Sequence, residues 1–577
     1  MASCAKLDAP RGARHGKLIL LFLLLALGSP AFAQQAPSDA SRLAAAQKAF
    51  DSSQWDEAAK LAQGPESQPP ELDLVRGLAL ARQQQWNESR QAFAAGHLKN
   101  PSDPRFLVEL AGIDYKQNDY SAAKRKLRAA LRLGSRDTYT SDFLGTIYFL
   151  QGNLEAALKC WNAINKPRLR NVAVQPPPRL EETLLSRAIA FNAPQVLSGD
   201  AMLSTRARLE NLGIFSRERV ELTSAGENFD ATLHVAERNG WGDSKLEGAI
   251  ALLSGVPYAT VYPEVYNLGH RAINFTSLLR WDSEKRRAFA AFSTPLFDNP
   301  ARRLQLYFDA RNENWNLSNT YFGARPPLGD LNLRRIAGGI KLHSVANGRW
   351  SWSTGMDVAS RSFQNLPGIT TAAEKAFFTE GDSLAYWLRA DRSLLRSPEH
   401  RFTLDTSAEG RIGRTFVDNL GAFGTARGSL DAHWLPRASG DDFELRTLVR
   451  AGATLGSVPF DELFQLGVER DNDLWLRGHA GTSDGRKGAA PLGRRYFLAN
   501  WEMDKNVYSN GFFTVKLGPF FDTGSIADGS GLFGSQRWQW DTGAQCKVRV
   551  LGSITVVLIY GRDLRGERNL FYGTVVR

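Results

Sequence analysis

A hydrolase-like pentapeptide is the clearest candidate for bond chemistry in this chain. Residues 481–485 read Gly-Thr-Ser-Asp-Gly and match the expression Gly-x-Ser-x-Gly. In hydrolases with this motif the serine stands on a sharp turn between a strand and a helix, which exposes its hydroxyl as a nucleophile. Here the flanks, from Gly478 to Gly493, are glycine-rich and charged. The sequence therefore favours a chance match, and a surface hydrolase that uses Ser483 ranks last among our hypotheses.

Histidines and cysteines give no sign of a metal centre or a redox pair. The eight histidines are scattered, and the three cysteines, Cys4, Cys160 and Cys546, stand far apart. Metal sites and redox motifs need such residues at short, regular spacings. The chain also has no phosphate-binding loop and no dinucleotide fingerprint. We therefore expect no catalytic residue, no metal and no cofactor, and a function that depends on binding.

The first 33 residues have the pattern of a secretory signal peptide. Basic residues precede an apolar run from Leu18 to Leu27, and Ala31-Phe32-Ala33 follows as a cleavage site. The mature chain is thus expected to work outside the cytoplasm. Its formal charge of +11 (71 basic minus 60 acidic residues) is for this reason not read as nucleic-acid binding.

Residues 34–167 contain a helical repeat. The bulky residues Trp55, Trp86, Tyr120 and Leu154 open similar short patterns and are spaced by 31, 34 and 34 residues. A small residue follows three positions after each of them, which lets neighbouring helices approach closely. Thirty-four residues is the period of the tetratricopeptide repeat, and this region resembles that family. The resemblance implies an all-α solenoid, either a plain scaffold or a surface for a periplasmic protein partner.

Residues 168–239 change to a mixed pattern. A strand at 169–174, helices at 180–190 and 199–212, and two further strands are expected. The order strand, helix, helix, strand, strand, with Leu212-Gly213-Ile214-Phe215 after the second helix, resembles a polypeptide-transport-associated (POTRA) domain. Such a domain leads directly into a membrane barrel.

Residues 240–577 alternate between apolar and polar side chains, as along 304–310 and 443–451. Alternation fits both a soluble sandwich and a barrel in lipid, and the period alone does not separate them. Three features favour the membrane: the signal peptide, about 338 residues of strands without helical interruption, and aromatic residues near presumed strand ends. Those aromatic residues are Trp281, Trp315, Tyr386, Trp434 and Trp501. We expect a transmembrane antiparallel β-barrel of about 16 strands.

Four segments of the last third occur in a specific order. They are 464–469, 476–479 (Leu-Arg-Gly-His), 496–502 and 518–524 (Gly-Pro-Phe-Phe-Asp-Thr-Gly). In this order, and with Tyr262 to Gly269 as a first hairpin, residues 168–577 resemble the bacterial surface antigen family, the BamA/TamA-like outer-membrane proteins with POTRA domains and a barrel. The resemblance implies a multidomain protein of the outer membrane, with N-terminal domains in the periplasm.

The resemblance also implies a site. In the family, an Arg-Gly on a loop folded into the lumen meets acidic residues on neighbouring strands. By motif these residues are Arg477 and Gly478 on the loop, and Glu502 and Asp522, with Gly524, on the strands. Two departures stand out: His479 replaces the usual aromatic residue, and the chain ends on Thr574-Val575-Val576-Arg577 and not on an aromatic residue.

The implied function is the insertion, assembly or translocation of unfolded or secreted client polypeptides at the outer-membrane bilayer. A POTRA strand can pair with an extended client, and the first and last barrel strands meet at a seam that could open. The seam segments would be 245–253, with Glu247 and Ile250, and 570–576, with Phe571 and Tyr572. The alternative is a passive channel or structural barrel that assembles nothing.

Overall fold

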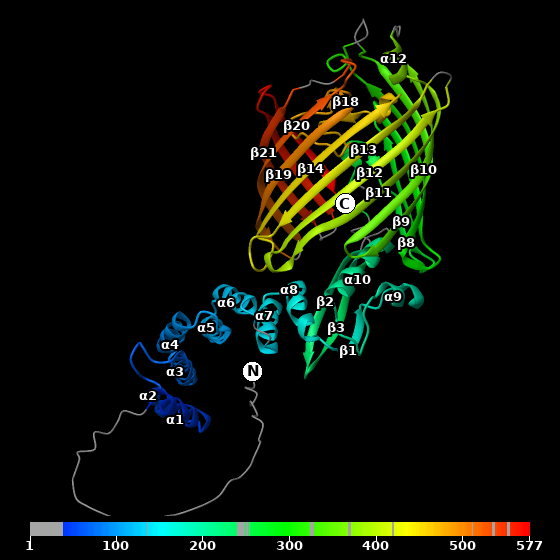
Figure 1. Ribbon diagram of the computed structural model, residues 1–577. Coiled ribbons are helices and arrows are strands. Elements are labelled where there is room, and N and C mark those ends of the chain that lie inside the picture. Colours follow the sequence, from blue (N-terminus) through cyan, green and yellow to red (C-terminus); the bar gives the residue numbers. More distant parts are fainter. Residues whose placement is uncertain are drawn as a thin grey trace, which may run out of the picture. The chain divides into compact units, whose positions relative to one another are not determined.

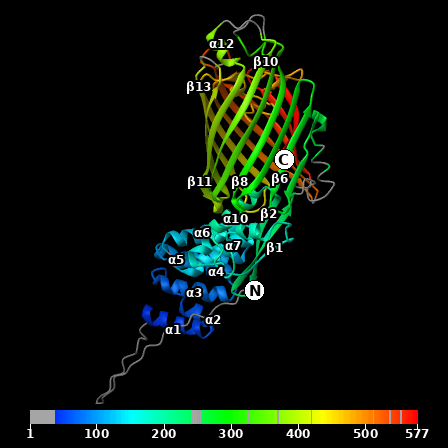
Figure 2. The same ribbon diagram turned by 90° about the vertical axis from the view of Figure 1, so that its right-hand side faces the viewer.

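The structure is a computed structural model (Figures 1 and 2). It describes residues 38–134, 137–238, 249, 252, 254–322, 328–366, 371–417, 420–510, 512–533, 537–550 and 554–576. The signal-peptide prediction for residues 1–33 and the predicted seam residues Glu247 and Ile250 lie outside the described residues. The chain divides into two compact units, one up to Asp119 and one from Tyr120 onwards.

The first unit is built from antiparallel helices. They are α1 (Asp39–Asp51), α2 (Trp55–Leu61), α3 (Pro70–Arg82), α4 (Trp86–Lys99) and α5 (Pro104–Lys116). The small residues of the repeat explain the close packing, since a Cβ on Gly77 of α3 would lie 2.4 Å from the ring of Phe93 on α4. The hydroxyl of Ser89 donates to the carbonyl of Gly77 over 2.7 Å. The proline at the start of α3 and of α5 occupies a position where a helix needs no amide donor.

The second unit opens with three more helices. They are α6 (Tyr120–Arg132), α7 (Thr138–Leu150) and α8 (Leu154–Trp161), followed by the short η1 (Asn162–Ile164). Gly145 of α7 lies against the indole of Trp161, as Gly77 lies against Phe93. The predicted N-terminal helical region is confirmed, and its assignment to the tetratricopeptide family stays a prediction. Among the described residues, no helix combines the length and the apolar character that a membrane crossing requires.

A small mixed domain follows. Its elements are β1 (Leu169–Gln175), α9 (Glu182–Ala188), α10 (Gly199–Leu212), β2 (Phe215–Ala225) and β3 (Asn228–Glu237). The strand order is β1-β3-β2, with β1 parallel and β2 antiparallel to β3, so β2 is an edge strand. Leucines of both helices pack on Leu233 and Val235 of β3. Gly213 ends α10 in the left-handed conformation that glycine adopts most easily.

The rest of the chain forms one large antiparallel sheet. Its strands are β4 (Thr260–Val261), β5 (Glu264–Leu268), β6 (Ile273–Trp281), β7 (Lys285–Leu296), β8 (Asn299–Trp315), β9 (Leu331–Asn347), β10 (Trp350–Gln364), β11 (Gly381–Ser397), β12 (Phe402–Thr415), β13 (Ala422–Trp434), β14 (Phe443–Gly456), β19 (Arg495–Ser509), β20 (Phe513–Ala527), β21 (Gln539–Val550), β22 (Ile554–Asp563) and β23 (Asn569–Val576). The last strand, β23, stands next to β4 in the strand order, as in a barrel. The predicted C-terminal antiparallel sheet is confirmed, and the count of about 16 strands stays a prediction.

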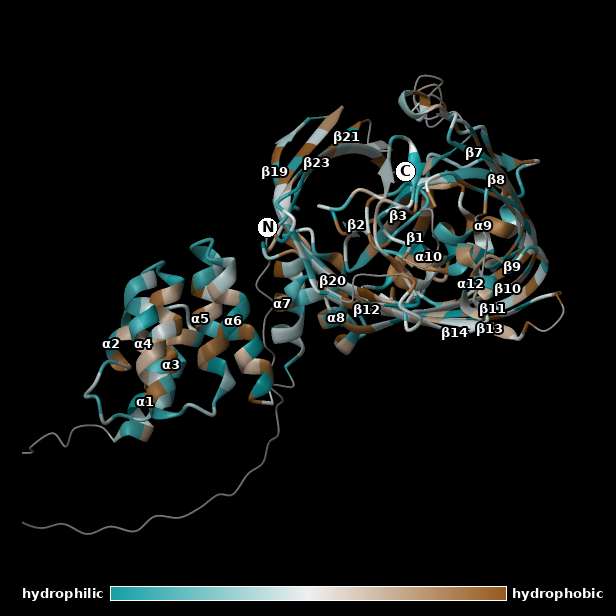
Figure 3. Ribbon diagram, turned by 90° about the horizontal axis from the view of Figure 1, so that it is seen from above, coloured by the Kyte–Doolittle hydropathy of each residue, from teal (hydrophilic) through white to brown (hydrophobic). Residues whose placement is uncertain are grey.

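The strands of this sheet contain both hydrophobic and hydrophilic residues, seen as brown and teal along the ribbon (Figure 3), and the exposure of their side chains distinguishes the two faces. Along β10, Met356 and Val358 are exposed. Asp357, which stands between them, and Arg361, further along the strand, are buried. The outer face is therefore apolar and the inner face carries charges. This arrangement suits a surface of lipid outside and a hydrated lumen inside.

The small domain packs at one end of the sheet. The Asn211 amide of α10 donates to Pro300 O at the start of β8 over 2.8 Å, and Lys159 of α8 pairs with Glu399 over 2.7 Å. Glu399 belongs to η3 (Pro398–His400), the turn between β11 and β12. These contacts identify the end of the barrel that faces the small domain.

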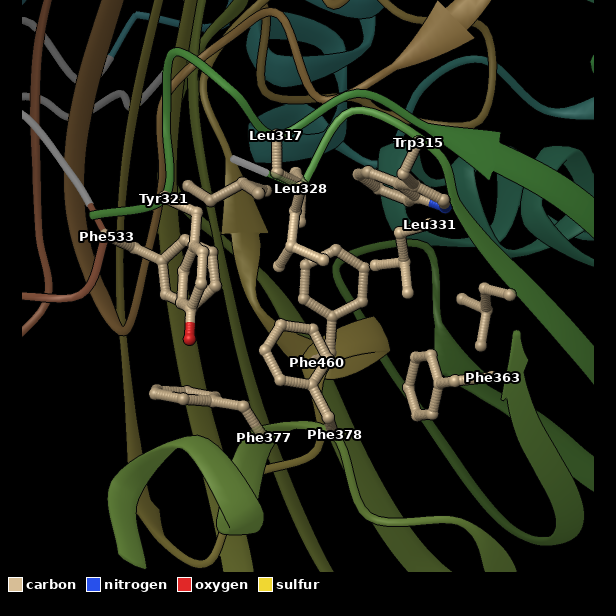
Figure 4. Packing of buried hydrophobic residues seen from close by; sticks show 12 residues of the cluster. Trp315, Leu317, Tyr321, Leu328, Leu331, Phe363, Phe377, Phe378, Phe460 and Phe533 are labelled. Carbon is tan, nitrogen blue, oxygen red and sulfur yellow. The ribbon is translucent and has the colours of Figure 1, made fainter. Parts of the chain in front are cut away.

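A cluster of buried apolar side chains, which we call the aromatic cap, lies at the opposite end of the barrel, and Figure 4 shows its packing. It joins the connections after β8, β10, β14 and β20, and the connection after β10 includes α12 (Ala372–Phe377). Its buried members are Trp315, Leu317, Tyr321, Leu328, Leu331, Leu333, Phe363, Phe377, Phe378, Phe460, Leu492 and Phe533. The sequence placed Trp315 near the end of a strand, and the structure agrees. Trp315 does end β8, yet it is only 8% exposed and its ring lies 4.9 Å from that of Phe460.

Candidate functional site: the lumen segment and the barrel seam

The connection between β14 and β19 folds back against the inner face of the barrel. We call residues 457–494 the lumen segment. It contains η4 (Phe460–Glu462) and four two-residue strands, β15 (Phe464–Gln465), β16 (Thr482–Ser483), β17 (Arg486–Lys487) and β18 (Leu492–Gly493). The Asn472 amide donates to the carbonyls of Gln465 and Gly467 over 2.8 and 2.9 Å. One polar side chain thus holds the turn that leads to Arg477.

Arg477 is the centre of one set of contacts. Its Nη2 and Nε atoms donate to both oxygens of Asp522 over 2.7 and 2.9 Å, and its Nη1 donates to Glu502 over 2.9 Å. The guanidinium also lies 4.0 Å from the ring centroid of Phe520. Arg477 is 5% exposed and Asp522 is fully buried. Such a buried, two-pronged pair is directional, and loss of one partner leaves an unpaired buried charge.

A second cation contacts the carboxylates near Arg477. Lys547 of β21 bonds Glu502 and Asp504 over 2.8 and 2.7 Å. Gln545 donates to the same two carboxylates and accepts from Arg477. The network therefore links β19, β20 and β21 with the lumen segment.

The two predicted glycines have different positions. The Gly478 amide donates to Asp541 of β21 over 2.6 Å, and a Cβ there would lie 2.7 Å from the backbone nitrogen of Asp563. No larger residue fits at position 478 without a shift of the wall. Gly524 stands on β20, where a Cβ would lie 3.3 Å from Leu466 of the lumen segment. The structure thus brings Arg477, Gly478, Glu502 and Asp522 together, with Gly524 beside another part of the segment.

A second cluster, absent from the sequence predictions, surrounds Asp471. Its carboxylate bonds Arg280 of β6 over 2.8 Å and Arg287 of β7 over 2.7 Å, and lies 3.4 Å from Lys487. Burial alone would raise the pKa of Asp471, but these cations hold it well below its usual range. Lys487 in turn bonds Glu313 of β8 over 2.7 Å. Since the partners lie far apart in the sequence, no local motif could have revealed this cluster.

A third cluster holds the start of the segment. Asp461 forms ion pairs with Arg335 of β9 over 3.0 Å and with Arg361 of β10 over 2.9 Å. Its neighbour Glu462 bonds Arg411 of β12 over 3.1 Å. The lumen segment is therefore tied to strands β6–β8, β9–β12 and β19–β22, on several sides of the barrel.

The seam between β23 and β4 carries its own contacts. The Tyr258 hydroxyl, just before β4, donates to Gly573 O of β23 over 2.6 Å. Arg470 of the lumen segment places its guanidinium 3.5 Å from the centroid of the Tyr258 ring and donates to Tyr258 O. On the other side, the Trp475 ring lies 5.9 Å from that of Tyr572. The lumen segment thus contacts both sides of the seam.

The predicted seam residues on β23 face opposite ways. Phe571 is 70% exposed on the outer surface, and Tyr572 is partly buried against the lumen segment. Their predicted counterparts, Glu247 and Ile250, belong to residues that the structure does not describe.

Ser483 stands at the end of β16 and is followed by a tight turn. Asp484 and Gly485 have positive φ, and the Ser483 hydroxyl donates to Asp484 over 3.3 Å. The next element is the strand β17, not the helix that a nucleophile elbow requires. The residues of the pentapeptide thus form a hairpin turn.

The lumen contains a polar cavity of about 720 Å³ at the end near the small domain. Arg303, Lys341 and His343 line it from the barrel wall, and Glu210 and Asn211 of α10 line it from the small domain. The barrel interior is therefore wide and polar at this end and packed with aromatic rings at the other.

Comparison with known proteins finds no matching family model, and no curated protein matches. Several solved structures align with part of this chain. BamA from Haemophilus ducreyi lacking POTRA domains 1–3 is 13% identical, with a TM-score of 0.42 over 71% of this chain and 84% of that chain. CdiB from Escherichia coli (13%, TM-score 0.47) covers 71% and 75%, and CdiB from Acinetobacter baumannii (13%, TM-score 0.43) covers 71% and 73%.

Proposed function

We propose that this protein is an outer-membrane β-barrel that inserts, assembles or translocates other polypeptides. The observation that carries the proposal is the unequal pair of strands at the seam. β23 has eight residues, whereas β4 beside it has two. Among the described residues β4 matches only part of the length of β23, and we propose that the rest of this strand edge pairs with an extended client chain.

The apolar outer face supports the membrane location. Side chains such as Leu306, Phe308 and Leu388 are about half exposed, although each is large and apolar. In water a surface of this extent would aggregate, whereas in lipid it is stable. The N-terminal domains then lie in the periplasm, after removal of the signal peptide.

The small domain supplies a second edge for a client. We propose that it acts as a POTRA domain and that its edge strand β2 pairs with extended polypeptides. A cleft of about 620 Å³ runs beside Val220 of β2, between α10 and the barrel turns near Phe402 and Leu435. A client strand on β2 would thus lie close to the barrel entrance.

The remaining parts have supporting roles in this proposal. Arg477, with Glu502 and Asp522, anchors the lumen segment, and the segment braces the seam through Arg470 and Trp475. The helices, as tetratricopeptide repeats, recruit a periplasmic protein partner. The whole mechanism uses binding and strand exchange, with no covalent step, no metal and no cofactor.

A passive channel or structural barrel is the second candidate, and the polar cavity of about 720 Å³ favours it. Flow along the barrel axis would, however, require the aromatic cap to open. The cap joins Phe460 and Leu492 of the lumen segment to rings from three other connections. A pore closed in this way needs a large rearrangement to conduct.

Depletion of the protein separates the two candidates. Under our proposal, other outer-membrane proteins, or one secreted protein, fall in abundance after depletion, and the wild-type gene restores them. The variant Arg477→Ala should restore them poorly, whereas Arg302→Ala, a change at an exposed position on β8, should restore them fully. Suppose that depletion leaves the abundance of the other proteins unchanged, while planar bilayers made from the depleted membranes lose ion conductance. This result would establish the channel and overturn the proposal.

A further inference from the structure

His479, next to the Arg477 anchor, lies between two carboxylates of the barrel wall. Its Nδ1 atom is 3.1 Å from Oδ2 of Asp541 on β21. Its Nε2 atom is 3.5 Å from Oδ2 of Asp563 on β22. Both aspartates are buried and the histidine is partly buried. Both ring nitrogens therefore face an oxygen that accepts hydrogen bonds.

The protonation state of His479 decides whether this arrangement is favourable. A neutral imidazole has one N–H, so one of its nitrogens would present a lone pair to a carboxylate. An imidazolium donates from both nitrogens. The imidazolium therefore suits both contacts, and Oδ1 of Asp541 is buried beside it without a hydrogen-bond partner among the described residues.

The charges around His479 come from four elements. Asp541 and Asp563 face it directly, Arg568 approaches from the turn between β22 and β23, and Asp522 of β20 acts through Asp541. Arg477 is already bonded to Asp522 and Glu502. Burial lowers the pKa of His479, but the hydrogen bond to Asp541 and the charges of both aspartates outweigh it and raise the pKa above the usual value.

A metal ion fits this group less well than a proton. The three side chains offer ligand atoms within 4.8 Å of one another. However, one ion binds only one nitrogen of a histidine, and here each carboxylate faces a different nitrogen. A proton on the ring satisfies both contacts at once.

We propose that protonated His479 is a second tether of the lumen segment, which makes the anchorage of this segment sensitive to pH. His479 is a positioning residue that holds the turn of Arg477 to β21 and β22. Because its folded-state pKa is raised, the tether is complete below the ordinary histidine pKa of about 6.5 and is lost as the pH rises through the folded-state value. The inference concerns the barrel itself and does not rest on client handling.

Hydrogen exchange of the full chain in detergent tests the proposal. We expect the protection of residues 474–482, corrected for the intrinsic exchange rate, to fall several-fold between pH 6 and pH 9. In His479→Gln and His479→Phe, protection should be low at both pH values. His400→Gln changes an exposed histidine on a turn and should retain the wild-type response.

Other outcomes have defined meanings. If the position 479 variants do not fold, Asp563→Asn takes their place, and it should flatten the pH response because one carboxylate partner is neutral. An equal pH response in wild type and His479→Gln would overturn the proposal. Zn²⁺ that restores protection at pH 9, with loss of protection in EDTA at pH 6, would overturn it in favour of a metal site.

Discussion

At the residue scale, the structure explains why a single arginine can hold a long connection. Arg477 reaches two strands with one planar group and stacks on Phe520. A lysine would supply the charge but not the two-pronged geometry. The same segment carries the opposite charge at Asp471, which bonds arginines on other strands. Opposite charges at two points fix both the position and the orientation of the segment.

The change Arg477→Ala should destabilise the folded barrel by about 3 to 5 kcal/mol, because Asp522 then remains buried and unpaired. Heat-modifiable migration on a gel measures this as a lower unfolding temperature, and the lumen segment should become accessible to protease. The exposed-site variant Arg302→Ala is the control. Full protection and full activity in Arg477→Ala would show that the arginine does not anchor the segment.

The change Tyr258→Phe tests the seam. It removes the hydroxyl that bonds Gly573 O and leaves the ring against Arg470. One hydrogen bond contributes about 0.5 to 1.5 kcal/mol, so the barrel should stay folded while the seam opens more often. Hydrogen exchange over residues 569–576 should quicken, whereas Tyr386→Phe, on the outer face of β11, should leave it unchanged. The bond plays no part in the seam if Tyr258→Phe exchanges like wild type.

At the element scale, sequence patterns located the helices and the sheet but missed the connections. Alternation along β10 and the 34-residue period each follow from local geometry, so they can be read from the chain. The Arg477 contacts were accessible only through a motif resemblance. The Asp471 and Asp461 clusters join residues far apart in the sequence, and so does the contact of Trp315 with Phe460, so none of these contacts could be read from a local pattern.

The aromatic cap gives a prediction at this scale. Phe460 is fully buried between Trp315 and Phe378, and its removal should weaken the cap by about 3 to 5 kcal/mol. The variant Phe460→Ala should therefore open more often in planar bilayers and conduct more than wild type. Phe106→Ala removes an equally buried ring from helix α5 and should not change conductance. Equal conductance in all three proteins would show that the cap does not close the barrel.

At the scale of the whole molecule, we propose that three binding surfaces act together with one barrel. In the proposed function, the helices, the edge strand of the small domain and the edge of β23 each hold a polypeptide, and the lumen segment links the seam to the barrel wall. The apolar outer face suits a position in lipid. The central claim of this proposal is that a client chain contacts the seam while the barrel is in the outer membrane.

Photocrosslinking in living cells tests this claim most directly. A photoreactive residue at position 571, on the exposed side of β23, is compared with one at position 386, on the exposed side of β11 and away from the seam. The account predicts that pulse-labelled, newly made outer-membrane or secreted polypeptides crosslink at 571 and not at 386. Identical crosslinks at the two positions, or none from newly made chains, would contradict it.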